Sequence, residues 1–122
     1  MTARNTTVKT AIQSTSPDGR YVVRIAPWEA RNSHWVSSPE IVDTRTGHGF
    51  FKFASESWSA DHSAWESDSQ VRLTLRKYPG GQPRHTLVVM VDCVAGVAGI
   101  EGGASVALEA LEAALDKALH AA

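Results

Sequence analysis

The clearest structural signal in this sequence is the segment VRLTLR at residues 71–76. Apolar and polar residues alternate along it, which is the pattern of a β-strand that buries one face. The segment TLVVMV at residues 86–91 follows after the strand-breaking sequence PGG at residues 79–81. From its second residue onward this segment is apolar on both parities, so it predicts a central strand that is covered on both faces.

Turn sequences divide the part of the chain before this pair into hairpins. Residues 16–19, SPDG, place proline where φ is preset and glycine where positive φ is needed, so they predict a tight turn. Residues 43–47, DTRTG, end in Thr-Gly and predict a second turn. Alternation and residue type then predict strands at residues 8–13, 21–26, 35–43 and 49–54.

The C-terminal segment at residues 104–120 has the spacing of an amphipathic helix. Its leucines recur at helical intervals, and Ser105 is the expected N-cap. The glycine-rich sequence at residues 96–103 has neither the GxGxxG nor the GxxxxGK[ST] spacing of a phosphate loop. We therefore interpret it as a connection between the last strand and the helix.

These elements predict the fold class. A run of strands with short loops, followed by one helix, is typical of an α+β domain in which the helix packs on one face of an antiparallel sheet. With 122 residues, the chain has the size of one domain. Within a single domain of residues 1–122, we expect a frayed end at 1–7, an antiparallel meander of about five to six strands at 8–94 and a helix at 104–120.

The composition excludes several classes of protein. With 12 Lys+Arg against 13 Asp+Glu, the net charge of −1 is not that of a protein that holds nucleic acid mainly through its phosphates, so no direct nucleic-acid partner is expected. No apolar run has the length of a signal peptide or a membrane span, so we expect a cytoplasmic protein with no membrane partner. The single cysteine, Cys93, has no disulfide partner in the chain.

The residues that carry chemistry do not form a catalytic or metal-binding motif. The histidines lack the HxxxH spacing that places two ligands on one helix face, so neither a metal nor another cofactor is expected. Asp61 and His62 are an adjacent acid–histidine pair, but neighbouring residues of an extended segment point to opposite faces. Cys93 continues the apolar parity of residues 87–91, so we interpret it as a buried residue without a catalytic role.

The four tryptophans are the strongest signal of a binding surface. They bracket two polar runs, at residues 29–34 and 59–64, that are expected to be loops or strand ends. Tryptophan and arginine are enriched among the hot spots of protein interfaces, although an indole ring can also close the end of a core. The expected partner-binding residues are Trp28, Arg31, His34, Trp35, Asp61 and His62.

The predicted helix offers an alternative partner-binding face of three acidic residues, Glu109, Glu112 and Asp116. Glu112 and Asp116 are like charges four residues apart, a spacing that mildly destabilises a helix. Either these residues form an ordinary solvated surface, or they are kept for a basic partner.

Three short sequences resemble the strand-and-turn segments of β-propeller blades: SPDGRY at residues 16–21, DTRTG at residues 43–47 and WSAD at residues 58–61. A propeller needs about four blades of four strands, which is more than this chain provides. The resemblance therefore implies local hairpins and no propeller function.

As a whole, the chain resembles immunity proteins of bacterial contact-dependent and other polymorphic toxin systems in its size, composition and small α+β organisation with aromatic loops. This resemblance implies a protein-binding module that occupies and blocks a cognate toxin domain. Two alternatives remain open. One is a small ligand-binding or enzymatic domain with Asp61, His62 and Cys93 near one cleft, and the other is a structural subunit that assembles through an exposed sheet edge.

Overall fold

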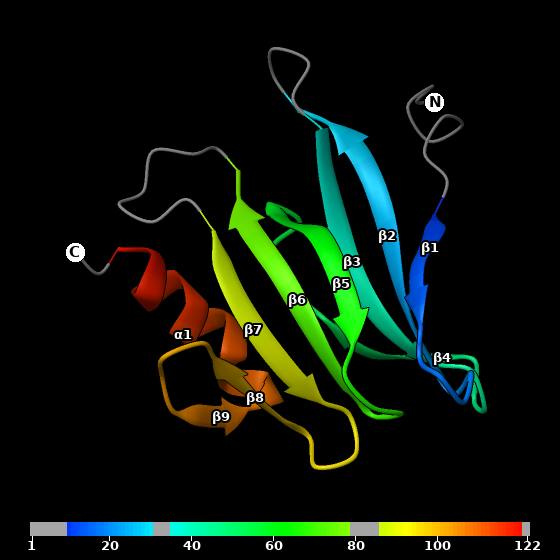
Figure 1. The fold of residues 1–122 in the computed structure, drawn as a ribbon. Helices are drawn as coiled ribbons and strands as arrows, with labels where there is room; N and C mark the ends of the chain where they lie inside the picture. Colours follow the sequence, from blue (N-terminus) through cyan, green and yellow to red (C-terminus); the bar gives the residue numbers. More distant parts are fainter. Residues whose placement is uncertain (1–9, 31–34, 79–85, 121–122) are drawn as a thin grey trace.

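The computed structural model describes residues 10–30, 35–78 and 86–120. These residues form two antiparallel sheets and one C-terminal helix, so the predicted α+β class is confirmed (Figure 1). The first sheet has the strand order β1-β2-β3-β4, and the second has the order β5-β6-β7-β8-β9. The elements are β1 (Ala11–Thr15), β2 (Tyr21–Glu29), β3 (Trp35–Asp43), β4 (His48–Lys52), β5 (Trp58–Trp65), β6 (Gln70–Lys77), β7 (Leu87–Asp92), β8 (Val97–Ile100), β9 (Ser105–Ala107) and α1 (Leu108–Leu119).

The expected single meander of five to six strands is wrong in two respects. The described residues contain nine strands. They are divided between two sheets, because β4 and β5 are not neighbours in either sheet. In the β4–β5 connection, the N–H groups of Ala54 and Ser55 donate to the carboxylate of Glu112 at 2.8 and 3.0 Å. A side chain of the helix therefore satisfies backbone groups at the point where the chain passes from the first sheet to the second.

Both predicted turns close hairpins of the four-stranded sheet. The turn at residues 16–19 joins β1 to β2, with Gly19 at φ 77°, and the turn at residues 43–47 joins β3 to β4, with Gly47 at φ 74°. Positive φ explains why glycine occupies each of these positions. β3 has the predicted bounds, whereas β1 begins later than expected and β2 continues to Glu29.

The five-stranded sheet buries one face, here called the inner face, and leaves the other, the outer face, open. In β6, the inner residues Val71, Leu73 and Leu75 are at most 1% exposed, as the alternation predicted. In β7, the outer residues Val88 and Met90 are only half-buried. The prediction that β7 is covered on both faces is wrong, because the helix and the four-stranded sheet both pack on the inner side (Figure 1).

The sequence between β7 and the helix forms a hairpin and not the irregular connection expected there. β8 pairs with β7, and β9 pairs with β8, so the two short strands extend the sheet. Gly96 and Gly102, at φ 72° and 84°, lie in the turns on either side of β8. The helix begins at Leu108, because residues 105–107 pair with β8, and Ser105 is a strand residue and not the N-cap.

One core joins the two sheets and the helix. The helix contributes three fully buried side chains, Leu111, Leu115 and Leu119. Between the sheets, side chains replace a backbone ladder: the amide of Gln13 donates to the carbonyl of Ala60 at 3.0 Å, and the hydroxyl of Ser59 accepts the N–H of Ser37 at 2.9 Å. Within the described ranges, no helix is long and apolar enough to cross a membrane.

Candidate protein-binding site

Two of the expected partner-binding residues come together beside the outer face. Trp35 begins β3 and is 54% exposed, and Asp61 lies in the middle of β5. Arg76 of β6 joins them: its Nε donates to both carboxylate oxygens of Asp61 at 2.9 Å, and its Nη2 donates to the backbone carbonyl of Trp35 at 3.2 Å. We call these three residues the Trp35 patch.

A β-bulge turns Asp61 toward Arg76. The register of β5 against β6 shifts between Ala60 and His62, so Asp61 has no partner in the ladder. Bulges interrupt strand alternation and commonly re-aim a side chain. As a result, Asp61 and His62 are both exposed, although neighbours on a regular strand point to opposite faces.

The ion pair between Arg76 and Asp61 orients the guanidinium of Arg76 and adds little to folding stability. Each of the two side chains is 38% exposed, and exposed ion pairs contribute little to folding stability. The hydrogen bonds to Asp61 and to the backbone of Trp35 nevertheless hold the guanidinium in one position. Arg76 is thus already ordered, and it contacts the backbone of a residue whose side chain is exposed.

Trp28 has a different environment from Trp35. Its indole N–H donates to Ser38 Oγ at 3.0 Å and to the carbonyl of Glu56 at 3.1 Å, and its ring packs edge-on against Tyr78 with 6.3 Å between the ring centroids. These contacts anchor the β2–β3 hairpin to the β4–β5 connection, so Trp28 serves packing within the chain. The other two expected residues of this segment, Arg31 and His34, lie outside the described residues.

Two of the three acidic residues of the helix, Glu112 and Asp116, have partners within the chain. Glu112 accepts two backbone N–H groups from the β4–β5 connection. Asp116 pairs with Lys77 Nζ at 2.7 Å, and the same ammonium lies 5.4 Å from the ring centroid of Trp58. These contacts explain why two like charges stand four residues apart without invoking a basic partner, and they leave Glu109 as the exposed member of the alternative face.

The structure does not gather Asp61, His62 and Cys93 into one cleft. Cys93 is 3% exposed within the core, as predicted, whereas Asp61 and His62 are exposed on β5. Burial raises the pKa of the Cys93 thiol to about 12, so this thiol is protonated at neutral pH and is a poor nucleophile. In the part of the chain that the structure describes, no group of three or more His, Cys, Asp or Glu side chains is placed to hold a metal ion.

Sequence reasoning missed two features of the outer face. Arg76 stands 41 residues from Trp35 in the sequence. The only feature of the sequence that pointed to it was its place at a polar position of the alternating segment 71–76. The second feature is a shallow hollow over β8, for which the only signal was Gly99, a glycine inside a strand.

Compared with protein-family models, with curated proteins and with solved structures, the chain has no match. The Trp35 patch and the open face beside it are therefore the features from which a function is inferred.

Proposed function

We propose that this protein is a protein-binding module whose contact surface is centred on the Trp35 patch. The observation that carries the proposal is the exposed side chain of Trp35, a residue whose backbone carbonyl is bound by an arginine that Asp61 holds in place. Tryptophan and arginine are the residue types most enriched among interface hot spots. Because the guanidinium is already ordered, association loses less side-chain entropy than it would with a free arginine.

We further propose that the partner is a toxin domain, which this protein blocks by occupying its surface. The support for this partner class is the resemblance to small immunity proteins of polymorphic toxin systems. A patch that offers an aromatic ring together with both signs of charge suits recognition of another protein surface, since charge complementarity there adds specificity and speeds association.

A second candidate is a structural subunit that assembles through a sheet edge. β1 ends the strand order of the four-stranded sheet, and Ile12 on this strand is 63% exposed. An edge strand with an exposed apolar side chain can pair with another chain. The two candidates use different surfaces, so single substitutions separate them.

The first test is affinity capture from a lysate of the native host with wild-type protein, Trp35→Ala and Ile12→Ala in parallel. We expect one protein to be retained by the wild type and by Ile12→Ala, and retention by Trp35→Ala to fall at least about tenfold. Equal retention by Trp35→Ala would contradict the proposed surface. Loss of retention with Ile12→Ala alone would favour assembly through β1.

The second test asks whether the captured protein is a toxin. Its isolated domains are expressed in bacteria with and without this chain, and growth is measured. We expect one domain to arrest growth, wild-type protein to restore it, and Trp35→Ala to fail to restore it. A captured partner without toxicity would leave the protein-binding module in place and overturn the immunity role.

A further inference from the structure

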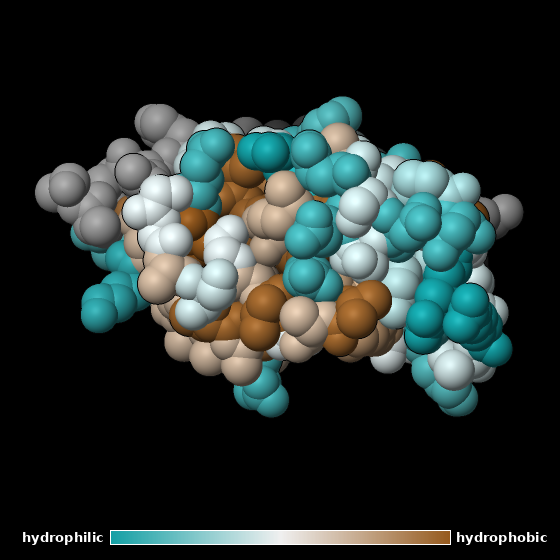
Figure 2. Space-filling model, turned by 60° about the horizontal axis from the view of Figure 1, so that its bottom comes forward, coloured by the Kyte–Doolittle hydropathy of each residue, from teal (hydrophilic) through white to brown (hydrophobic). Residues whose placement is uncertain are grey.

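The outer face of the five-stranded sheet is a second part of the exposed surface. Seen from below, hydrophobic colours gather on the side of β7, β8 and β9, and hydrophilic colours gather on the side of the four-stranded sheet (Figure 2). The outer residues Val88 and Met90 of β7 and Val97 of β8 are half-buried. This apolar surface belongs to the sheet that also carries Asp61 and Arg76.

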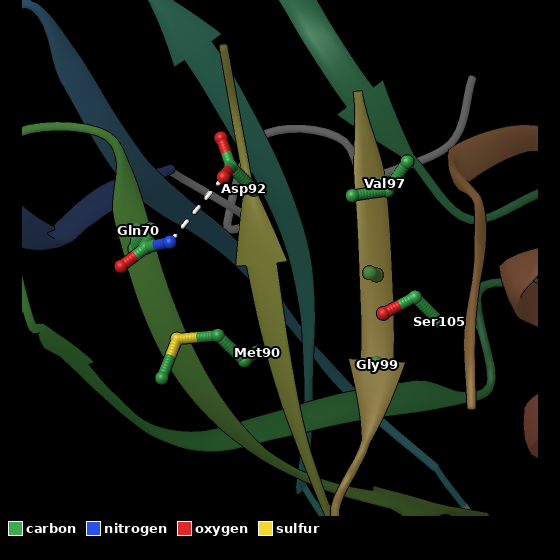
Figure 3. Close-up of a pocket in the computed structure, with 7 residues that line it drawn as sticks. Gln70, Met90, Asp92, Val97, Gly99 and Ser105 are labelled. Atoms are coloured by element: carbon green, nitrogen blue, oxygen red, sulfur yellow. Dashed lines mark hydrogen bonds between the residues drawn. The ribbon is translucent and has the colours of Figure 1, made fainter. Parts of the chain in front are cut away.

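A hollow of about 180 Å³ lies on this face over β8 (Figure 3). Its middle is a row of directly opposed residues, in which Met90 faces Gly99 and Gly99 faces Ser105. A second row, Gln70 opposite Asp92, closes one end. For comparison, an engineered cavity of about 150 Å³ in another protein holds one benzene molecule, so this hollow has room for a single side chain.

Gly99 creates the hollow. Among the described glycines, Gly99 is not one of those with positive φ, so its backbone does not require glycine. A Cβ added at this position would lie 3.4 Å from Ser105 Oγ, which is ordinary contact. Glycine inside a strand commonly marks the close approach of a ligand or of another chain. The missing side chain leaves space that a partner's side chain can fill.

The charge around the hollow is negative. The carboxylate of Asp92 accepts the N–H groups of Val94 and Ala95, each at 3.0 Å, and the side-chain amide of Gln70 at 3.3 Å. These hydrogen bonds, above all that from Ala95, hold the pKa of Asp92 below its usual value, so the group is an anion at neutral pH.

One basic residue, Arg72, continues the row of Met90, Gly99 and Ser105, and two carboxylates already neutralise its charge. Arg72 stands opposite Met90 in the ladder, and its guanidinium pairs with Glu66 at 3.3 Å and with Glu101 at 3.7 Å. Together with Asp92, three carboxylates thus accompany one guanidinium. A cationic guest is favoured over an anionic one by this distribution.

We propose that this hollow receives a basic side chain, lysine or arginine, from the protein partner. The apolar stem of the guest lies over Met90 and Val97, and its charged head meets the carboxylate of Asp92. This arrangement is the common one for long basic side chains, which bury their methylene groups and keep the charge at a polar rim. The inference rests on the proposed protein-binding function and identifies the chemistry of the partner.

The test is an NMR titration of the free protein with N-acetyl-arginine amide. N-acetyl-citrulline amide, which has nearly the same shape without the charge, and N-acetyl-glutamate amide serve as comparison probes. We expect saturable shifts of the backbone signals of Met90, Gly99 and Ser105 in the millimolar range, and binding of the citrulline probe at least about fivefold weaker.

Three variants make the titration specific. Gly99→Val fills the hollow, and Asp92→Asn removes the charge while keeping an oxygen for the N–H groups of Val94 and Ala95, so both should lose most of the shift. Ile12→Ala, on the four-stranded sheet, should bind like the wild type. Melting temperatures show whether each variant is folded.

Several results would overturn the inference. These are the absence of a saturable shift with the arginine probe, equal binding of the citrulline probe, or preferential binding of the glutamate probe, which would point to Arg72 instead. Because the titration contains no partner, its failure is distinct from failure of the capture experiment. If capture depends on Trp35 but the titration shows no shift, only the inference about the hollow would be overturned.

Discussion

The two faces of the five-stranded sheet are built on the same backbone, but one is buried in the core and the other is open. Along β6, the inner residues Val71, Leu73 and Leu75 are buried in the core, whereas Arg72 and Arg76 form ion pairs on the outer face. The apolar residues of the inner face are covered by the helix and the four-stranded sheet, and those of the outer face have no such cover among the described residues. We infer that the inner face carries folding stability and that the outer face carries recognition.

The two faces should differ strongly in stability when one residue on each face is truncated. Leu73→Ala leaves a cavity in a fully packed site and should lower the free energy of unfolding by about 2–5 kcal/mol. Met90→Ala, on the half-buried outer face, should cost less than about 1 kcal/mol, because its site is open to water. Urea unfolding measures both. Similar losses for the two variants would contradict the division of roles between the faces.

A smaller effect is expected where the helix meets the β4–β5 connection. Glu112→Ala removes the acceptor of two backbone N–H groups, from Ala54 and Ser55, and should cost about 1–2 kcal/mol. The matched control is Glu109→Ala on the exposed side of the same helix, which should stay within about 0.5 kcal/mol of the wild type. If the control loses as much as Glu112→Ala, general helix charge and not this contact would be responsible.

Acid should weaken the fold through a carboxylate at the rim of the outer face. Backbone hydrogen bonds hold the pKa of Asp92 in the folded chain below the ordinary aspartate value of 3.8. Its contribution to stability is therefore present above that pH and is lost as the pH falls through the folded pKa. We expect Asp92→Asn to show a smaller loss of stability than the wild type when urea midpoints are followed below about pH 4. An identical acid dependence in the two proteins would exclude Asp92 as a contributor.

The smallest effect on stability is expected at Trp35. Its ring is 54% exposed, so Trp35→Ala should change the free energy of unfolding by no more than about 0.5 kcal/mol. Trp58→Ala is the matched contrast, because Trp58 is 0% exposed and should cost about 3–5 kcal/mol. Thermal melting of both variants measures the difference. A large drop in melting temperature for Trp35→Ala would show that its ring belongs to the core.

Local patterns predicted the elements whose signal is local. The alternation of residues 71–76 located β6 and its buried face, and the turn sequences at residues 16–19 and 43–47 located two hairpins. β5 was missed, because half of its residues are polar and the bulge at Asp61 breaks its alternation. β8 and β9 were missed because they are short and lie in or next to a glycine-rich segment, and because the pairing of β8 with β7 and of β9 with β8 is what makes them strands.

The candidate site was only partly predictable for the same reason. Residue type singled out Trp35 and Asp61, but their meeting depends on Arg76 and on a contact that spans 41 residues of sequence. The packed position of Trp28 depends equally on distant partners, Ser38 and Glu56. Sequence can therefore indicate which side chains suit an interface, and the fold decides which of them remain exposed.

The most direct test of the outer face as the recognition surface is hydroxyl-radical footprinting of the captured complex beside the free protein. Met90 on this face and Trp35 beside it are oxidisable, and Trp58 is a buried tryptophan in the same chain. We expect oxidation of Trp35 and Met90 to fall on complex formation and that of Trp58 to stay low in both states. Unchanged oxidation of Trp35 in an intact complex would contradict the assignment of recognition to this face.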